Sequence, residues 1–299
     1  MLRDVGHGVP NLRLFVALFF LTTFCAQAEP LTLTDDSNTQ VTFTAPPQRI
    51  ISIAPNLTEL AYAAGLGSRM VAVTAYSDYP AAARKLPQVG DAFRLDWERI
   101  LAFKPDLVLA WKSGLSARDR AAFEKLKLKL LVLEPRRLDD IPRTLHLLGQ
   151  VGGTEQEAEA AVRDFERRRD ALRKQYAARP TVRAYFQIAD EPLLTVNGEH
   201  ILSDVLHLCG AENVFAAAPL LTPAVSDEAL VEAQPQILLG IADTPEQQEQ
   251  IRSRWRKLPL RAAGEGRMGF IPFDLISRPS PRILQGAARV CGVVESARR

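Results

Sequence analysis

Residues 153–180, GTEQEAEAAVRDFERRRDALRKQYAARP, decide how the chain is organised. No proline or glycine interrupts residues 154–179, and apolar side chains recur there at helical spacing among many charges. This pattern predicts one long, amphipathic and mostly solvated helix of more than twenty residues. A flexible linker would be rich in glycine and serine instead. We therefore expect a rigid helical spacer between the two parts of the chain that flank it.

Strands and helices alternate before the spacer. Residues 31–48 alternate apolar and polar residues on both sides of DDSN, which predicts a β-hairpin. RIISIAP (residues 49–55) and MVAVT (residues 70–74) are short apolar runs typical of buried strands, and residues 95–111 predict a helix, a proline and then a strand. Such alternation favours parallel sheets, so the predicted fold class is α/β.

Two local patterns predict where helices begin. Asn56 and Glu59 are spaced as in a capping box, with Asn56 as the N-cap, a helix running to about residue 64 and Gly65 just after it. Near the C-terminus, Ser280 is expected to cap a helix whose first position is Pro281.

A weak internal repeat appears after the spacer. Residues 96–105 and 226–235 both begin with a capping residue, place a glutamate two positions later and end in a proline before a strand. Residues 60–65 and 205–210 are a second similar pair. The repeat predicts two α/β lobes, at residues 29–152 and 181–299, joined by the helix of residues 153–180. Clefts between such lobes are common binding sites for small ligands.

The N-terminus has the features of a secretory signal. Arg3 and Arg13 enclose a polar region, residues 14–24 (LFVALFFLTTF) are apolar, and AQA at residues 26–28 is a cleavage signal. The apolar run is too short to span a bilayer. We predict a signal peptide at residues 1–28, a mature chain that starts at Glu29 and export to an oxidising compartment. Lipidation at Cys25 is not favoured, because Phe24 is bulky.

Removal of the signal leaves two cysteines, Cys209 and Cys291. Cysteines in an oxidising compartment usually pair, so we predict a disulfide between them, with two buried free thiols as the alternative.

Charge and motifs narrow the function classes. The net charge is +2 without a long basic block, which argues against nucleic acid as a partner. The four histidines form no HExxH motif, and the sequence holds no Walker loop, no G-x-G-x-x-G and no clustered metal ligands. We therefore expect no catalytic residues, no metal site and no cofactor. A secreted metal-dependent enzyme remains the less favoured alternative to a binding protein.

Several segments, in this order, resemble one protein family: RIISIAPNLTELAYAAGLG, AYSDYP, ERILAFKPDLVLAW, LCGAENVF and RPSPRILQGAARVCG. They are similar to the periplasmic solute-binding proteins of the cobalamin, haem and iron-siderophore type, most of all to the cobalamin branch. The resemblance implies two α/β lobes on one rigid backbone helix, with a ligand cleft between the lobes. It further implies a monomer in the periplasm that delivers cobalamin or a related corrinoid to the permease dimer and ATPase of an ABC importer. Haem or an iron-siderophore is the alternative ligand.

The resemblance also implies ligand-binding residues. Tyr76 and Trp111 match pocket aromatics, and Asp274 and Arg278 match polar residues at the pocket edge. From the residues alone, Tyr76 fits a core corner as well as a cleft, Trp111 fits a core as well as a pocket, and Asp274 and Arg278 fit a pair that bind each other. Three expected aromatic positions hold other residues: Ala92, Leu194 and Thr222. Phe93 and Trp97 are candidates to replace the lost aromatic area.

The paired glutamates of the repeat, Glu98 and Glu228, have two interpretations. Acids in the first turn of a helix stabilise the helix dipole. In the family, glutamates at such places contact the two permease subunits, which implies that Glu98 and Glu228 dock the protein on the importer.

Overall fold

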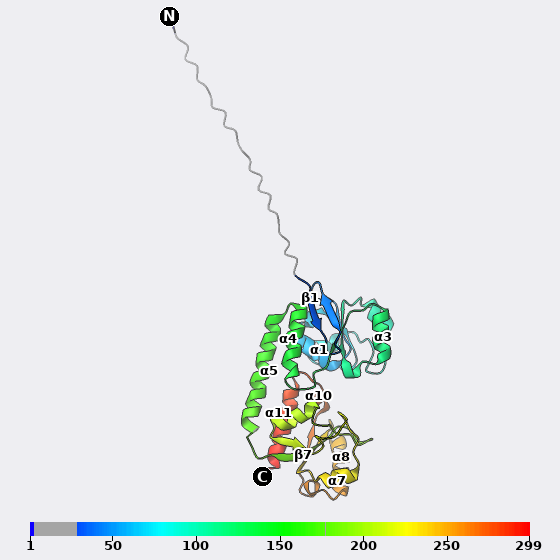
Figure 1. Ribbon diagram of the computed structural model, residues 1–299, viewed down its shortest axis with the longest axis vertical. Coiled ribbons are helices and arrows are strands. Elements are labelled where there is room, and N and C mark those ends of the chain that lie inside the picture. Colours follow the sequence, from blue (N-terminus) through cyan, green and yellow to red (C-terminus); the bar gives the residue numbers. More distant parts are fainter. Residues whose placement is uncertain (3–28, 177) are drawn as a thin grey trace.

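The computed structural model describes residues 1–2, 29–176 and 178–299. Two α/β lobes lie one above the other along the longest axis, and a long helix, α5 (Glu155–Tyr176), runs beside both (Figure 1). This helix has 22 residues, which confirms the long helix predicted from residues 153–180. The predicted signal peptide, Cys25 included, lies outside the described residues apart from Met1 and Leu2.

The N-terminal lobe begins with an antiparallel hairpin of β1 (Leu31–Thr34) and β2 (Gln40–Phe43), as predicted. The carboxylate of Asp35 closes the turn by accepting bonds from the backbone N–H groups of Ser37 (2.8 Å) and Thr39 (3.0 Å). A parallel sheet follows, made of β3 (Ile50–Ser52), β4 (Met70–Val73), β5 (Leu107–Trp111) and β6 (Leu130–Leu133). Its helices are α1 (Pro55–Ala63), α2 (Trp97–Ala102), α3 (Ala117–Lys125) and α4 (Asp140–Gly152), with short 3₁₀ helices η1 (Gly67–Arg69), η2 (Ala83–Lys85) and η3 (Lys112–Gly114).

The C-terminal lobe contains the second parallel sheet. Its strands are β7 (Val182–Gln187), β8 (Ala211–Asn213), β9 (Ile237–Ile241) and β10 (Met268–Ile271). Its helices are α6 (Ile201–Leu208), α7 (Asp227–Ala233), α8 (Pro245–Lys257), α9 (Arg261–Gly264), α10 (Phe273–Ile276) and α11 (Ile283–Ser296).

The two sheets share one topology. Their strand orders are β4-β3-β5-β6 and β8-β7-β9-β10, so in each lobe the first strand lies between the second and the third. Helices α2 and α7, which lie within the two repeated segments, are capped alike. Asp96 accepts a hydrogen bond from the N–H of Arg99 (3.0 Å), and Ser226 accepts one from the N–H of Ala229 (3.2 Å). The weak sequence repeat therefore reflects two lobes of the same build.

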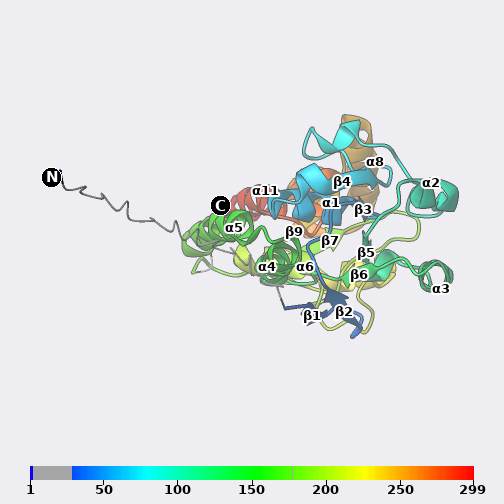
Figure 2. The same cartoon turned by 90° about the horizontal axis from the view of Figure 1, so that it is seen from above.

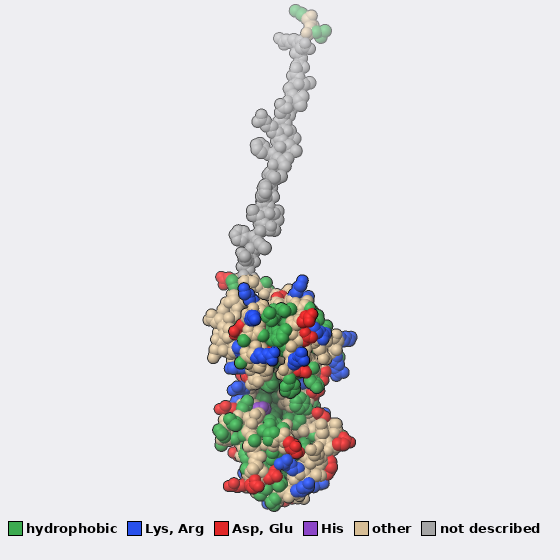
Figure 3. Space-filling model, turned by 90° about the vertical axis from the view of Figure 1, so that its right-hand side faces the viewer, with side chains coloured by type: hydrophobic (Ala, Val, Ile, Leu, Met, Phe, Trp, Pro, Cys, Tyr) green, Lys and Arg blue, Asp and Glu red, His purple; other side chains and the backbone are tan. Residues whose placement is uncertain are grey.

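Helix α5 packs against α4 and α1 of the first lobe and against α6 and α11 of the second. Viewed from above, α5 lies at one side of the molecule, while α2 and α3 lie at the other (Figure 2). On the side away from α5 the surface is hollowed between the lobes, and hydrophobic side chains gather there (Figure 3). The long helix thus joins the lobes along one edge and leaves a cleft on the opposite one.

Both predicted helix starts are wrong. Helix α1 starts at Pro55 with Ala54 as its N-cap, because the fixed φ of proline suits the first helical position. Asn56 therefore lies inside the first turn, and Glu59 does not reach back to a cap. Helix α11 starts at Ile283 rather than Pro281, and Ser280 makes no cap because its hydroxyl donates to Glu59 Oε2 (2.5 Å).

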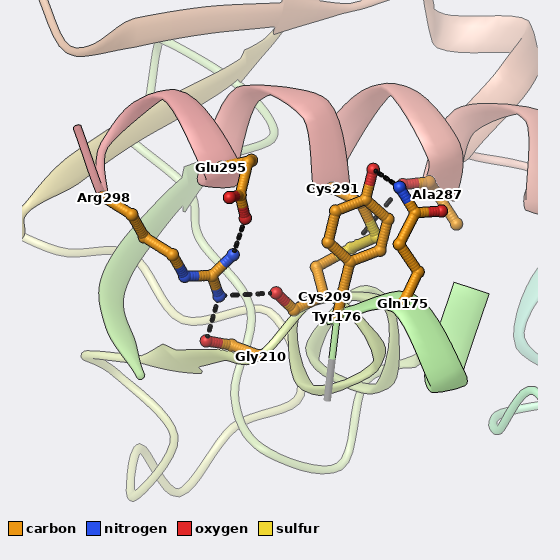
Figure 4. The surroundings of a disulfide bond; sticks show 8 residues. All are labelled: Gln175, Tyr176, Cys209, Gly210, Ala287, Cys291, Glu295 and Arg298. Carbon is orange, nitrogen blue, oxygen red and sulfur yellow. Dashed lines mark hydrogen bonds and ion pairs between the residues drawn. A yellow bond between two sulfur atoms is a disulfide. The ribbon is translucent and has the colours of Figure 1, made fainter. Parts of the chain in front are cut away.

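Cys209 and Cys291 form a disulfide, as predicted (Figure 4). It ties the end of α6 to α11, across a sequence separation of 82 residues. Beside it, Arg298 donates to Glu295 (2.6 Å) and to the backbone carbonyls of Cys209 and Gly210 (both 2.9 Å). The C-terminal helix is therefore held to the second lobe by one covalent and several polar contacts.

Candidate ligand-binding site

A cavity of about 590 Å³ opens between the lobes. Its walls come from the segments that follow β3, β4 and β5 in the first lobe, and β9 and β10 in the second. In open parallel sheets, ligands bind where the carboxyl ends of strands meet. Tyr76, Trp111, Asp274 and Arg278, the four residues predicted to bind ligand, all line this one cavity.

Aromatic rings form part of the wall. Tyr76 is 76% exposed and has a φ of 65°, a left-handed conformation that is unusual for a bulky residue. The core-corner interpretation of Tyr76 is therefore wrong. Trp111 is half-buried at the end of β5, and its ring borders the cavity. Phe273, which the sequence did not single out, adds a third ring from the second lobe.

The cavity wall carries acidic charge. Three carboxylates, from Asp78, Asp243 and Asp274, and one guanidinium, from Arg278, line it, which is a formal charge of −2. Arg278 is fully engaged with neighbours: its Nη2 lies 2.7 Å from Asp274 Oδ1 and its Nη1 lies 2.6 Å from Asp78 Oδ1. The predicted pairing of Asp274 with Arg278 therefore exists, within the cavity wall.

A buried ionic network joins the lobes beneath the cavity. Glu59 of α1 is 3% exposed and receives bonds from Arg278 (3.1 Å), from Arg282 (2.7 and 3.1 Å) and from Ser280. Arg282 also lies over the ring of Tyr79, 4.2 Å from its centroid. Sequence reasoning missed this role of Glu59, because its partners lie more than 200 residues away along the chain.

The network shifts two pKa values. Burial acts to raise the pKa of Asp78, but the hydrogen bond and charge of Arg278 outweigh it and hold that pKa below its usual value. Burial acts to lower the pKa of Arg278, but its bonds to Asp78 and Glu59 raise it above the usual value. Both side chains therefore remain charged at neutral pH.

Several buried polar atoms of the wall have no partner. Within the part of the chain that the structure describes, six buried side-chain nitrogen or oxygen atoms lack a hydrogen bond. Four of the six belong to residues that line this cavity: Asn56 Nδ2, Thr74 Oγ1, Trp111 Nε1 and Ser277 Oγ. These four atoms are themselves buried, so they lie behind the surface of the cavity wall rather than on it.

Of the three positions where an expected aromatic residue is missing, one lines the cavity and two do not. Ala92 lines the cavity and leaves space there, whereas Leu194 and Thr222 are not part of its wall. Trp97 is not part of this cavity's wall: it packs edge-on against Phe123 (4.8 Å between ring centroids) and, together with Phe93, borders a neighbouring hollow. Phe93 is exposed, and the neighbouring hollow has a volume of about 690 Å³.

Glu98 and Glu228 are exposed and hold the same place in their lobes. Each is the second residue of its helix, α2 or α7, directly after the capped start. Bonds from its own backbone N–H and from Ser226 lower the pKa of Glu228, so this glutamate is ionised at neutral pH. The two acids therefore hold equivalent positions in the two lobes, although they lie far apart along the chain.

Among residues 1–2, 29–176 and 178–299, no group of three or more His, Cys, Asp or Glu side chains is arranged to hold a metal ion. In the same part of the chain, no helix is both long and apolar enough to cross a bilayer.

Comparison with known sequences identifies relatives over most of the chain. A family model described as periplasmic binding protein matches residues 50–274. The vitamin B12-binding protein of Pectobacterium carotovorum is 37% identical over 252 residues, which cover 82% of this chain and 87% of that protein. The vitamin B12-binding protein of Yersinia pestis is 37% identical over 247 residues, covering 82% and 85%.

Solved structures show the same fold. The periplasmic vitamin B12 binding protein of Vibrio cholerae superposes with a TM-score of 0.77 at 33% identity, covering 85% of this chain and 99% of that one. A periplasmic haem binding protein of Pseudomonas aeruginosa gives 0.73 at 26% identity, covering 83% and 92%. These relatives are binding proteins, which confirms the expectation of a binding protein and not an enzyme. The matches in sequence and fold establish that the chain belongs to the periplasmic binding protein family.

Proposed function

We propose that the protein binds cobalamin or a related corrinoid in the cavity between its lobes and delivers it to an ABC importer. The single observation that carries the choice of ligand is the cavity itself: it combines aromatic rings with a formal charge of −2. Corrinoids are large and rich in neutral amides, so they suit a wall of rings, acids and hydrogen-bond donors. The names of the vitamin B12-binding relatives support the same choice.

Haem is the rival ligand, and the charge of the cavity disfavours it. Haem carries two propionates, which need cationic partners, and Arg278 is already bound by Glu59, Asp78 and Asp274. Anionic ferric siderophores meet the same obstacle. The observation that favours haem is Tyr76, whose exposed phenol at the cavity is a possible axial ligand.

Calorimetric titration with cyanocobalamin, and in parallel with haemin, tests the ligand. We expect one-to-one binding of cyanocobalamin to protein purified from the periplasm. Tyr76→Phe separates the two ligands, because it keeps the ring for a corrinoid and removes the oxygen that would bind haem iron. Haemin binding that disappears in Tyr76→Phe, without cyanocobalamin binding to the wild type, would contradict the corrinoid proposal.

We further propose that Glu98 and Glu228 dock the protein on the two subunits of a permease dimer that works with its ATPase. Their equivalent, exposed positions on α2 and α7 support this, since a two-lobed monomer can then meet a two-fold symmetric partner. Charge reversal by Glu98→Arg or Glu228→Arg should abolish import of radiolabelled cobalamin and leave binding unchanged. Glu155→Arg, which changes an exposed first-turn glutamate of α5 on the edge away from the cleft, is the matched control. Equal import by all three variants would refute the docking role.

We also propose that residues 1–28 are a signal peptide that is removed on export. The mature chain then consists of two lobes, at residues 29–152 and 181–299, and a connecting helix at residues 153–180. The periplasmic location of the family supports the export. N-terminal sequencing of protein from the periplasm should begin at Glu29. A retained N-terminus would show that the segment is not cleaved.

A further inference from the structure

A second hollow, of about 690 Å³, adjoins the ligand cavity in the first lobe. This side pocket is lined by Ala75, by residues between Gln88 and Arg99, and by two residues of α3, Arg118 and Asp119. Ala75 also lines the cavity, so the two hollows are neighbours. Helices α2 and α3 lie on the side of the molecule opposite α5 (Figure 2), which places the side pocket at the open side of the cleft. Its volume is typical of pockets that hold small molecules, about 300–1,000 Å³.

Three arginines of the side pocket have no partner among the residues that the structure describes. The guanidinium groups of Arg94, Arg99 and Arg118 make no hydrogen bond and no ion pair within residues 29–176 and 178–299. The three come from different elements: the loop of residues 90–95, helix α2 and helix α3. An arginine offers five N–H donors in a fixed, planar fork. Three such forks therefore border one hollow with their donors unused.

The acids of the same wall bond to other groups. Asp91 Oδ1 accepts from two backbone N–H groups of its own loop (2.8 and 2.9 Å), and these bonds lower the pKa of Asp91. Asp96 caps α2, and Asp119 accepts from the hydroxyl of Ser116 at the start of α3 (2.6 Å). Three acids and three arginines give the wall a formal charge of zero, yet no described acid is paired with these arginines. The arginines are therefore the charged groups left to bind a ligand, and they select an anion.

An aromatic ring lies beside the arginines. Phe93 is 96% exposed and belongs to a loop that is closed by its own backbone. Gly90 pairs with Leu95 as an isolated bridge, and the N–H of Asp91 donates to the carbonyl of Arg94 (3.0 Å). Gly90 has a φ of 117°, and a Cβ there would lie 2.2 Å from the Arg94 carbonyl oxygen, so the turn requires glycine. The loop therefore presents the Phe93 ring beside the arginines, free to stack on a planar group.

We propose that the side pocket binds a phosphate joined to an aromatic ring, which is the chemistry of a nucleotide. The oxygens of a phosphate point in several directions, so they accept from arginines on three elements at once. The two oxygens of a carboxylate lie in one plane and match a single guanidinium. The ring of Phe93 stacks on the aromatic base, a contact that every base can make.

Two sources fit this chemistry: a free nucleotide, and a nucleotide attached to the ligand in the main cavity. Only the attached source rests on the proposed function, because cobalamin carries a phosphate and an aromatic base in its nucleotide loop. Ala92 leaves room for an attached group, since it lines the cavity, directly precedes Phe93 and has no ring that would separate the two hollows.

Calorimetric titration with adenosine 5′-monophosphate (AMP), adenosine and ribose 5-phosphate tests the side pocket. AMP should bind at least about 10-fold more tightly than either part alone, because only AMP meets both the arginines and the ring. The double change Arg99→Gln and Arg118→Gln should lower AMP affinity about 10-fold to 100-fold, and Phe93→Ser about 5-fold to 100-fold. Arg289→Gln, which changes an exposed arginine of α11 outside the pocket, should stay within about twofold. Thermal unfolding of each variant checks that the fold is intact.

A parallel titration with cyanocobalamin and with dicyanocobinamide, which lacks the nucleotide, identifies the source. If the pocket variants weaken binding of cyanocobalamin but not of dicyanocobinamide, the nucleotide is attached to the ligand. If they weaken binding of AMP alone, the nucleotide is free. AMP binding by a wild type that does not bind cyanocobalamin would support the side pocket and contradict the proposed function.

Three results would overturn the side pocket. A wild type that does not bind AMP, with pocket variants that bind cyanocobalamin as the wild type does, would refute it and leave the proposed function intact. Equal affinity for AMP and ribose 5-phosphate would contradict the stacking on Phe93. Import of cobalamin that is lost in the pocket variants, with every binding affinity unchanged, would assign Arg99 and Arg118 to contact with the permease instead.

Discussion

The two lobes share a strand order but use their aromatic residues differently. In the first lobe, Tyr76 and Trp111 border the cavity. In the second, Tyr185 and Trp255 are fully buried, and Trp255 stacks on Phe270 with 5.7 Å between ring centroids. Only Phe273 of this lobe, among the described aromatic residues, borders the cavity. The same scaffold thus supplies a binding wall on one side and a stiff, internally packed support on the other.

The largest effect on stability is expected at Glu59, where the two lobes meet. Removing its charge in Glu59→Gln leaves Arg278 and Arg282 without their shared buried partner, so we expect the free energy of unfolding to fall by about 3–5 kcal/mol. Urea unfolding measures the change, and solution scattering shows whether the lobes then rotate independently. Glu159→Gln, which breaks an exposed pair with Arg163, should cost less than about 1 kcal/mol. Equal losses in the two variants would contradict a structural role for the network.

The second lobe also has the disulfide, which the first lobe lacks within its described residues. Opening the bond by the double change Cys209→Ala and Cys291→Ala should destabilise the protein by about 2–5 kcal/mol, because a long loop regains its entropy when unfolded. Comparing urea unfolding with and without a reductant gives the wild-type control. A variant as stable as the oxidised wild type would show that packing of α11 alone suffices.

Ligand binding can be used to compare the contributions of the two lobes to the cavity wall. If the first lobe is the main binding wall, Trp111→Ala should weaken cyanocobalamin binding by about 10-fold to 100-fold, since a whole ring leaves the contact. Phe273→Ala, from the second lobe, should weaken it less. Calorimetry on both variants gives the ratio directly. A larger loss for Phe273→Ala would reverse the assignment of the main wall.

The smallest expected effect concerns pH and the second lobe. His200 caps α6 by accepting from the N–H of Leu202 (3.2 Å), and burial lowers its pKa from 6.5 to about 4. As the pH falls below 6.5, the unfolded chain takes up this proton first, so stability decreases until the pH reaches about 4. Between pH 7 and about pH 5.5 the loss should be about 1 kcal/mol. His200→Asn, which keeps a capping side chain, should remove this part of the pH dependence in thermal unfolding.

Much of the frame could be predicted from local sequence. The long helix, the parallel strands and the repeat follow from periodicity, because a helix or strand must turn one face to a core whatever its distant neighbours are. The disulfide followed from the count of cysteines left after the predicted cleavage. Tyr76, Trp111, Asp274 and Arg278 were singled out by resemblance, and they do lie around one cavity, although their contact with a ligand stays a prediction.

Local sequence patterns therefore predicted the order and type of the elements, together with the two-lobed plan. The local pattern had assigned Asn56 and Glu59 to a helix cap, whereas folding places Asn56 inside the first turn and gives Glu59 distant partners. Pro55 moves the helix start, and arginines more than 200 residues away claim the glutamate. The physical reason is one of competition: a capping bond is worth about 1 kcal/mol, whereas leaving a buried charge unpaired costs several. Partners brought close by folding therefore override the local motif.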